Sequence, residues 1–320
     1  MGLESLYICL CLCIFVSVFS QYYIHYYSYY SYYYYYNLRV WEEDESSDGN
    51  GTECTARVLS TISLEEYLHV AGTVPIPPYF HRAAEASDKE SYNNVYAAAD
   101  GSVAAPTAGL HFTDQVLADL GGDNCSFLSL HVGAGTFKPV LVSDARDHSM
   151  HAESFSVSVC EMKRIIAAMD DGKPILAVGT TSSRTLESLY WCGVQRLRGA
   201  DTDTDRHHLV LGQFDWIPWM VGETATCRSA FQSLVEGLED TDVISGKTSL
   251  MIVPGSYEFK VVDHLVTNFH APDSTLMLLV AAFLESGEKV KSVYDEAQRE
   301  GYRFLSYGDV CMFSRPGSSK

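Results

Sequence analysis

The stretch KPILAVGTTSSRTLESLYW, residues 173–191, contains the pattern that decides the fold. Residues 173–179 are almost continuously apolar and end in a glycine, which predicts a buried strand, and residues 180–191 continue with the spacing of a helix. The stretches 126–132 and 153–159 alternate apolar and polar residues and predict two half-buried strands, the second followed by an amphipathic helix. Strands and helices in this order are typical of an α/β domain, which is the fold class we predict.

The composition of the chain changes along its length and predicts where the domain begins. Residues 1–40 form an apolar and Tyr-rich leader in which no Lys or Arg precedes Arg39, so signal and transit peptides are not indicated and a non-native gene start is one interpretation. Residues 41–62 are acidic and predict a linker. The domain is expected over residues 63–320, with an insertion or long surface loop at 195–245, where the periodic pattern is lost.

The charge and the cysteines restrict the classes of partner. The 22 basic and 41 acidic residues give a net charge of -19, so a nucleic acid would need a local basic patch on the protein. The nine cysteines include no CxxC pair, which favours neither a disulfide framework nor a zinc knuckle. Reduced thiols and an intracellular setting are the interpretation that fits.

Three turns rich in small residues predict a ligand site: APTAGLHFT at 105–113, HVGAGTF at 131–137 and VGTTSSRT at 178–185. Backbone N–H groups at such turns bind anions or ligand oxygens, although none of the three matches a phosphate-binding fingerprint. Histidines adjoin the first two turns, and His270 precedes a helix cap, so a shared pocket is expected. Plain turns and buried, hydrogen-bonded histidines are the alternative interpretation.

The stretch HSMHAE, residues 148–153, raises a rival hypothesis. It places His148, His151 and Glu153 at close spacing, as in a metal-dependent hydrolase. The helical HExxH pattern is absent, so we predict no metal.

Seven motifs in this order closely resemble the S-adenosylmethionine:tRNA ribosyltransferase-isomerase family of queuosine biosynthesis (QueA): GTVPIPPYFHR, YNNVYAAADGSVAAPTAGLHFT, LSLHVGAGTFKPV, HSMHAE, AVGTTSSRTLES, FKVVDHLVTNFHAPDSTLMLLVAAF and YRFLSYGDV. The resemblance covers about residues 72–320 apart from 195–245. It implies an α/β catalytic domain, which family members combine with a smaller β-barrel domain. Tyr-rich and acidic sequence stands where the family's N-terminal motifs are expected, so the barrel is predicted to be missing or incomplete.

The resemblance also implies an activity. The ribosyl part of the co-substrate S-adenosylmethionine is transferred to 7-aminomethyl-7-deazaguanine at the wobble position of tRNA and isomerised, giving epoxyqueuosine and releasing adenine and methionine. A truncated, inactive homologue that binds a ligand or a partner is the alternative. The resemblance suggests a cytoplasmic location, whereas residues 1–40 leave a membrane tether or an organelle open.

Such a reaction needs a general base, because the sulfonium makes the adjacent 5′ CH₂ acidic. The candidate catalytic residues are two histidines as bases and two aspartates that orient a histidine or face the sulfonium: His111, His131, Asp263 and Asp309. The candidate substrate-binding residues come from the motifs, and their arginines suit phosphate or carboxylate groups. They are Thr107, Gly109, Gly133, Gly135, Thr180, Thr181, Arg184, Asn268, His270, Arg303, Tyr307 and Arg82.

Overall fold

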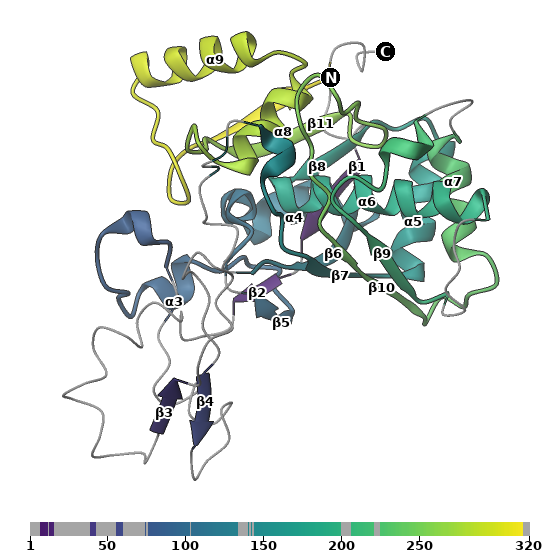
Figure 1. Cartoon of the computed structure of the whole chain (residues 1–320), viewed down its shortest axis with the longest axis horizontal. Coiled ribbons are helices and arrows are strands. Elements are labelled where there is room, and N and C mark those ends of the chain that lie inside the picture. Colours follow the sequence, from purple (N-terminus) through teal and green to yellow (C-terminus); the bar gives the residue numbers. More distant parts are fainter. Residues whose placement is uncertain are drawn as a thin grey trace. The chain divides into compact units, whose positions relative to one another are not determined.

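The structure is a computed structural model that describes residues 7–11, 13–15, 39–42, 56–59, 74, 76–102, 104–133, 140, 142, 144–199, 206–220 and 225–315. It divides into two compact units, one of residues 1–15 and 90–320 and one of residues 16–89. Figure 1 labels most of the helices and strands of both units.

The first unit contains most of the described elements. Its strands are β1 (Tyr7–Cys11), β2 (Cys13–Phe15), β5 (Ala99–Ser102), β6 (Cys125–His131), β7 (Glu153–Ser158), β8 (Ile175–Val178), β9 (His208–Leu211), β10 (Val243–Thr248), β11 (His264–Asn268) and β12 (Val310–Ser314). Its α-helices are α4 (Asp114–Leu120), α5 (Val159–Asp170), α6 (Gly179–Leu197), α7 (Cys227–Val235), α8 (Thr275–Phe283) and α9 (Gly287–Arg299). Its 3₁₀ helices are η3 (Thr107–His111), η4 (Gly122–Asn124), η6 (Ala145–Asp147) and η7 (Ile217–Trp219).

One mixed sheet organises this unit. Its described strands lie in the order β12-β11-β8-β1-β6-β7-β10-β9. The four neighbours β11, β8, β1 and β6 are parallel, whereas β12 and β7 run antiparallel to β11 and β6. Strands β6, β7 and β8 lie at the positions predicted from the apolar patterns, with α5 and α6 directly after β7 and β8. The predicted α/β fold class is confirmed.

The two faces of the sheet belong to separate cores. In β8, Ile175 and Ala177 join the larger core, and Leu176 and Val178 join the smaller one, because strand residues point alternately to opposite faces. Residues of α5, α6 and α7 complete the larger core (Figure 1), and residues of α4 and η3 complete the smaller one. A strand covered on both faces reads as a continuous apolar run, as the sequence does here.

Strand β1 comes from the stretch that the sequence analysis assigns to a leader. It lies between β6 and β8, and Tyr7, Ile8 and Cys9 are at most 2% exposed. The apolar run of the leader therefore supplies a central strand, although most of the leader and of the linker lies outside the described residues, and the domain boundaries stay predictions. None of the described helices combines the length and the apolar character that crossing a membrane requires.

The described part of residues 195–245 is not the long surface loop that we predicted, because it contains helices and strands. The C-terminal end of α6 falls in this range, and β9, α7 and β10 follow. Phe231, Leu234 and Ile244 are completely buried. These elements are short and separated by turns, so they produce no periodic pattern long enough to be recognised. That the range is an insertion relative to the family stays a prediction.

The second unit contains an antiparallel ribbon of β3 (Arg39–Glu42) and β4 (Ala56–Leu59), and η2 (Pro78–Phe80). The helix α3 (Asp88–Ser91) lies where the two units join in the chain. In the second unit, Arg82 donates hydrogen bonds to both carboxylate oxygens of Asp88, over 2.7 and 2.8 Å. Arg82 therefore belongs to a different unit from the other predicted site residues and holds a buried carboxylate there.

Candidate active site

The ends of three parallel strands bring the predicted turns to one edge of the sheet. Strand β6 ends at His131, β8 at Val178 and β11 at Asn268. These strands run in the same direction, so their carboxyl ends share an edge. Ligands of open α/β sheets bind in the crevice at this edge.

The η3 turn is fastened to the same edge. Thr107 Oγ1 donates a hydrogen bond to Asn268 Oδ1 over 3.0 Å. A Cβ placed on Gly179, the first residue of α6, would lie 3.8 Å from Ala108 Cβ. The η3 turn therefore meets the end of β11 and the start of α6.

Gly109 allows the backbone of η3 to lie against two polar side chains. A Cβ at Gly109 would overlap Tyr96 Oη and would lie 2.8 Å from Asn94 Nδ2. Asn94 Nδ2 also donates a hydrogen bond to the carbonyl of Pro106 over 3.3 Å. Sequence reasoning did not select Asn94 and Tyr96, although both lie in the quoted motif that contains Gly109. Their contacts explain why this turn needs a glycine.

The start of α6 offers backbone N–H groups. Val178 is the N-cap residue and makes no side-chain hydrogen bond to the helix. The first N–H groups of a helix have no partner within it and carry the positive end of the helix dipole. Gly179 has a φ of 88°, a conformation that glycine adopts without strain. Thr180 and Thr181 follow, buried and half-buried, so this helix start suits a ligand oxygen.

A buried carboxylate connects the turn after β6 to α6. Glu153, the first residue of β7, is 2% exposed and forms an ion pair with Arg184 in the second turn of α6. Glu153 Oε1 also accepts a hydrogen bond from the backbone N–H of Gly133 over 3.3 Å and lies 3.1 Å from His151 Nε2. Sequence reasoning considered Glu153 only as a metal ligand, because the pairing with Arg184 joins residues far apart in the chain.

This geometry changes the expected roles of Gly133 and Arg184. The N–H of Gly133, predicted to contact substrate, binds Glu153 instead. Burial lowers the pKa of Arg184 to about 10, so the guanidinium stays charged at neutral pH beside Glu153. Arg184 Nε is buried and has no hydrogen-bond partner among the described residues. Gly135 lies outside the described residues.

His111, at the end of η3, faces the C-terminal loop. Burial lowers the pKa of His111, and the nearby carboxylate of Asp309 and a hydrogen bond to the Gly308 backbone oppose this effect. Asp309 in turn accepts hydrogen bonds from the backbone N–H and the side chain of Arg303, over 2.7 and 3.0 Å. Three predicted site residues therefore lie together, and the guanidinium of Arg303 binds a carboxylate of the same loop.

The remaining predicted histidines differ in their surroundings. His131 ends β6 and has a buried Nδ1 without a hydrogen-bond partner among the described residues. His270 Nε2 lies 2.8 Å from Thr267 Oγ1, and its backbone N–H donates to Tyr294 Oη over 3.1 Å. Burial lowers the pKa of His270 to about 4, so the ring is neutral at physiological pH.

The structure places Asp263 away from the other predicted catalytic residues. Asp263 directly precedes β11, and its Oδ2 accepts a hydrogen bond from the backbone N–H of Ile175, the first residue of β8, over 2.9 Å. Its Oδ1 accepts from Arg315 over 3.2 Å. Five residues of extended strand, roughly 16 Å, separate Asp263 from Asn268. Asp263 therefore lies at the opposite edge of the sheet, where it joins the starts of two strands.

Tyr307 contacts the segment that precedes β5. Its Oη lies 3.2 Å from Ser91 Oγ, and its ring packs edge-on against Tyr92 with centroids 5.7 Å apart. Tyr307 therefore helps to hold the C-terminal loop in place.

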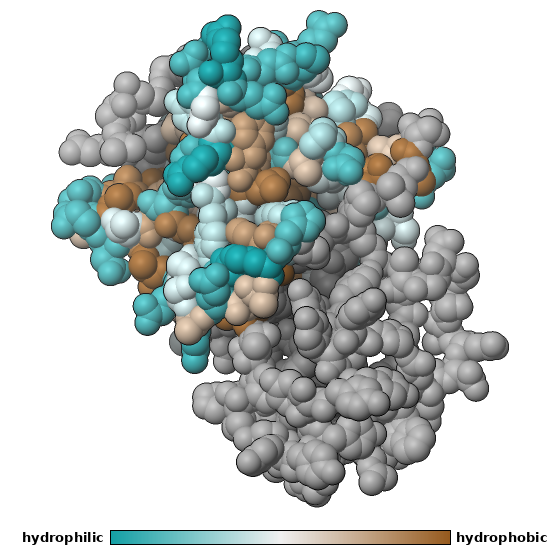
Figure 2. All heavy atoms as spheres, turned by 90° about the vertical axis from the view of Figure 1, so that its left-hand side faces the viewer, coloured by the Kyte–Doolittle hydropathy of each residue, from teal (hydrophilic) through white to brown (hydrophobic). Residues whose placement is uncertain are grey.

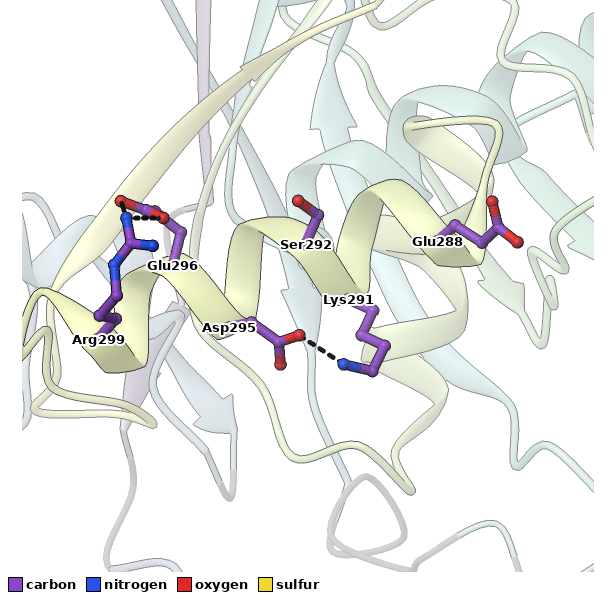
Figure 3. A pocket seen from close by; sticks show the side chains of 6 residues that line it. All are labelled: Glu288, Lys291, Ser292, Asp295, Glu296 and Arg299. Atoms are coloured by element: carbon purple, nitrogen blue, oxygen red, sulfur yellow. Dashed lines mark hydrogen bonds and ion pairs between the residues drawn. The ribbon is translucent and has the colours of Figure 1, made fainter.

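Two other places do not provide a site. Among the described residues no group of three or more His, Cys, Asp or Glu side chains is arranged to hold a metal ion, and Glu153 pairs with Arg184. A surface hollow of about 430 Å³ lies on the exposed face of α9 (Figure 3), where Lys291 pairs with Asp295 and Arg299 with Glu296. Hydrophilic residues also gather at the top of the face in Figure 2, at the height of α9 in Figure 1. Such self-paired charges are typical of a solvated helix face.

Known proteins resemble this chain over most of its length. The S-adenosylmethionine:tRNA ribosyltransferase-isomerase of Acidithiobacillus ferrooxidans is 40% identical over 249 residues, which are 77% of this chain and 58% of that protein. The protein of the same name from Legionella pneumophila (strain Corby) is also 40% identical over 249 residues, 77% of this chain and 60% of its own length. A crystal structure of S-adenosylmethionine tRNA ribosyltransferase from Thermotoga maritima matches 64% of this chain and 50% of that chain, with 30% identity and a TM-score of 0.38.

The coverage and the family match complete the comparison. The chain spans about three fifths of the length of the curated relatives it matches. The family model described as queuosine biosynthesis protein matches residues 21–313. This match begins within the predicted leader and includes the whole sheet edge described above. The chain therefore belongs to the queuosine biosynthesis protein family.

Proposed function

We propose that this chain is an S-adenosylmethionine-dependent tRNA ribosyltransferase-isomerase. It transfers the ribosyl part of S-adenosylmethionine to 7-aminomethyl-7-deazaguanine at the wobble position of tRNA and isomerises it to the epoxycyclopentane of epoxyqueuosine, with release of adenine and methionine. Two observations support the proposal: the chain belongs to the family, and η3, the start of α6 and the turn after β6 converge at one sheet edge. The convergence carries the argument, because a single pocket needs all three.

The distances along α6 favour one ligand site. Gly179 lies against η3, and Arg184 is paired with the carboxylate next to the turn after β6. Five helical residues, about 7.5 Å, separate these two points along the helix axis. An S-adenosylmethionine molecule is longer than this distance, so one donor molecule can reach both turns. In this proposal the N–H groups at the start of α6 bind its hydroxyl or carboxylate oxygens.

We assign a separate role to each group of predicted site residues at this edge. Thr107, Gly109 and Asn268 shape the wall at the end of β11. His111 lies near Asp309, and in this proposal the negative charge of Asp309 attracts the sulfonium of the donor. The other predicted residues at this edge, His131, Thr180, Thr181 and His270, stay candidates for substrate contact. The RNA binds by local basic groups, since the chain as a whole is strongly acidic. The cytoplasm is the proposed location.

The experiment that tests this function measures whether the ribose of S-adenosylmethionine is transferred to the RNA. The purified chain is incubated with S-adenosylmethionine labelled in the ribose and with an anticodon stem-loop that contains 7-aminomethyl-7-deazaguanine. The proposal is supported if the amount of adenine released equals the amount of labelled ribose that becomes attached to the RNA. The same stem-loop with guanine at the wobble position is the control and is expected to acquire no label. Donor binding without adenine release contradicts the proposed activity.

A homologue that binds the donor without turning it over is the alternative function. Calorimetric titration separates the two. Binding of S-adenosylmethionine with no adenine release under the conditions above identifies the binding protein, and measurable turnover excludes it.

A further inference from the structure

The carboxylate of Glu153 fixes the orientation of the His151 ring. His151 Nε2 lies 3.1 Å from Glu153 Oε1. An ionised carboxylate only accepts hydrogen bonds, so Nε2 carries the proton and donates it. In the neutral ring Nδ1 is then the nitrogen that can take up a proton.

Glu153 itself is held from two other elements. Its Oε1 also accepts the N–H of Gly133 over 3.3 Å, and its Oε2 pairs with Arg184 of α6. The side chain of Glu153 is 1% exposed, so water does not compete for these contacts. The positive charge of Arg184 compensates the buried negative charge. The carboxylate is therefore preorganised before any ligand binds.

The ring of His151 is reachable and lies at the predicted turn. One third of its side chain is exposed. A Cβ placed on Gly133 would lie 3.3 Å from His151 Cδ2, so the ring packs against the backbone of the turn after β6. The carboxylate is buried, and the ring that it orients is open to a ligand at the edge where the strands end.

The other histidines at this edge lack this combination. The ring of His270 is hydrogen-bonded to Thr267, and burial lowers its pKa to about 4. His111 is exposed, but the carboxylate near it, Asp309, is about one third exposed and not buried. Among the described histidines at this edge, His151 is the one that combines a partly exposed ring with a buried carboxylate partner.

We propose that His151 and Glu153 form the proton-transfer dyad of this site, with His151 as the base and Glu153 as its positioning residue. The inference rests on the proposed function. His151 Nδ1 takes a proton from the carbon bonded to the donor's sulfonium, and the electron pair of that C–H bond stays on the carbon. The imidazolium that results is stabilised by Glu153, as carboxylates stabilise histidine bases in other active sites.

The first test reads the ring directly and needs no turnover. In the chain labelled with ¹⁵N-histidine, the ring nitrogen shifts of His151, assigned by their loss in His151→Gln, are expected to report the Nε2–H tautomer. Glu153→Gln removes the negative charge beside the ring and is expected to change these ring nitrogen shifts. Glu161→Gln is the matched control, because Glu161 also accepts a backbone N–H, that of Phe127 in β6, and also pairs with an arginine, Arg164. An Nδ1–H tautomer, or the same spectrum in Glu153→Gln, overturns the dyad.

The second test follows the proton. S-adenosylmethionine deuterated at C5′ is incubated with the chain, and loss of deuterium to water is measured by mass spectrometry. His151→Gln is expected to lose at least about 100-fold in this rate, the usual range for a general base. Glu153→Gln is expected to lose about 10-fold or more in rate with little change in the KM for the donor, and Glu153→Asp is expected to recover part of it. His207→Gln, on an exposed residue outside this edge, is expected to match the wild type.

The outcomes separate the inference from the proposed function. Washout in the wild type that persists at the full rate in His151→Gln overturns the dyad and leaves the proposed function standing. No washout and no adenine release in the wild type contradict the proposed function, and the tautomer measurement then decides whether the pair exists. Circular dichroism of each variant shows that it is folded, and Glu153→Asp replaces Glu153→Gln where the latter is unfolded.

Discussion

Thr107 Oγ1 donates a hydrogen bond to Asn268 Oδ1 over 3.0 Å and so joins residues 161 positions apart in the chain. The contact connects the η3 turn to the end of β11, at the edge where the parallel strands finish. Asn268 is 2% exposed, so this oxygen has no access to bulk water. The shape of the proposed donor pocket depends on this pair, because it fixes one wall of the pocket to the sheet.

Replacing Thr107 by Val tests this connection. The change keeps the shape of the side chain and removes the donor, so the buried Asn268 oxygen loses its partner. We expect the free energy of unfolding to fall by about 1–3 kcal/mol in urea denaturation. In a double-mutant cycle with Asn268→Ala, the two effects are expected to be less than additive. Full additivity would show that the two side chains do not interact.

Gly109→Ala is expected to displace the η3 turn. The added Cβ overlaps Tyr96 Oη, and overpacking of this kind costs about 1–3 kcal/mol of unfolding free energy. Binding of S-adenosylmethionine, measured by calorimetry, is expected to weaken as well. Gly122→Ala is the matched control, because a Cβ at Gly122 has nothing within 4 Å. Equal effects of the two substitutions would be incompatible with the packing described for Gly109.

Asp309→Asn is expected to lower the pKa of His111. The carboxylate of Asp309 raises the pKa of this ring against the effect of burial, and its removal also leaves the Arg303 charge uncompensated. Titration of the His111 resonances by NMR measures the shift. Asp295→Asn, which removes the partner of Lys291 on α9, is the control and is expected to leave His111 unchanged. An upward shift in Asp309→Asn would contradict the arrangement of this loop.

His270 makes the stability of the fold sensitive to acid. Its pKa is lowered to about 4 in the folded protein, below the ordinary value of 6.5, because the ring is buried. Between these values only the unfolded chain binds the proton, so stability falls as the pH decreases through this range. From pH 7 to pH 5 this residue is expected to account for about 2 kcal/mol. Urea denaturation of His270→Gln is expected to show a pH dependence smaller by that amount, and an unchanged dependence would exclude His270 as its source.

Ile8→Asp tests whether the apolar part of the leader is a strand of the sheet. Ile8 is 2% exposed and lies in register with Cys125 and Leu176. A carboxylate buried there without a partner is expected to cost more than about 4 kcal/mol and to abolish cooperative unfolding. Val116→Asp, at a residue of α4 that is 38% exposed, is expected to have little effect. An unchanged transition in Ile8→Asp would show that β1 contributes nothing to the fold.

Local patterns explain which parts of the fold were predictable. The apolar run at 173–179 and the alternation at 126–132 predicted β8 and β6, because burial on two faces or on one face leaves a direct signature in the residue order. Residues 195–245 contain no long apolar run and no regular alternation of apolar and polar residues. The strands in this range are short, and their burial depends on neighbours that are distant in the chain.

The sequence by itself determined the α/β class, the turns with their glycines and the family, because these depend on residues that are close together in the chain. Only the tertiary structure decided which side chains meet. The bounds of β11 placed Asp263 before the start of the strand and Asn268 at its end, and the tertiary fold paired Glu153 with Arg184. Contacts across a sheet depend on strand order and register, which local periodicity does not encode.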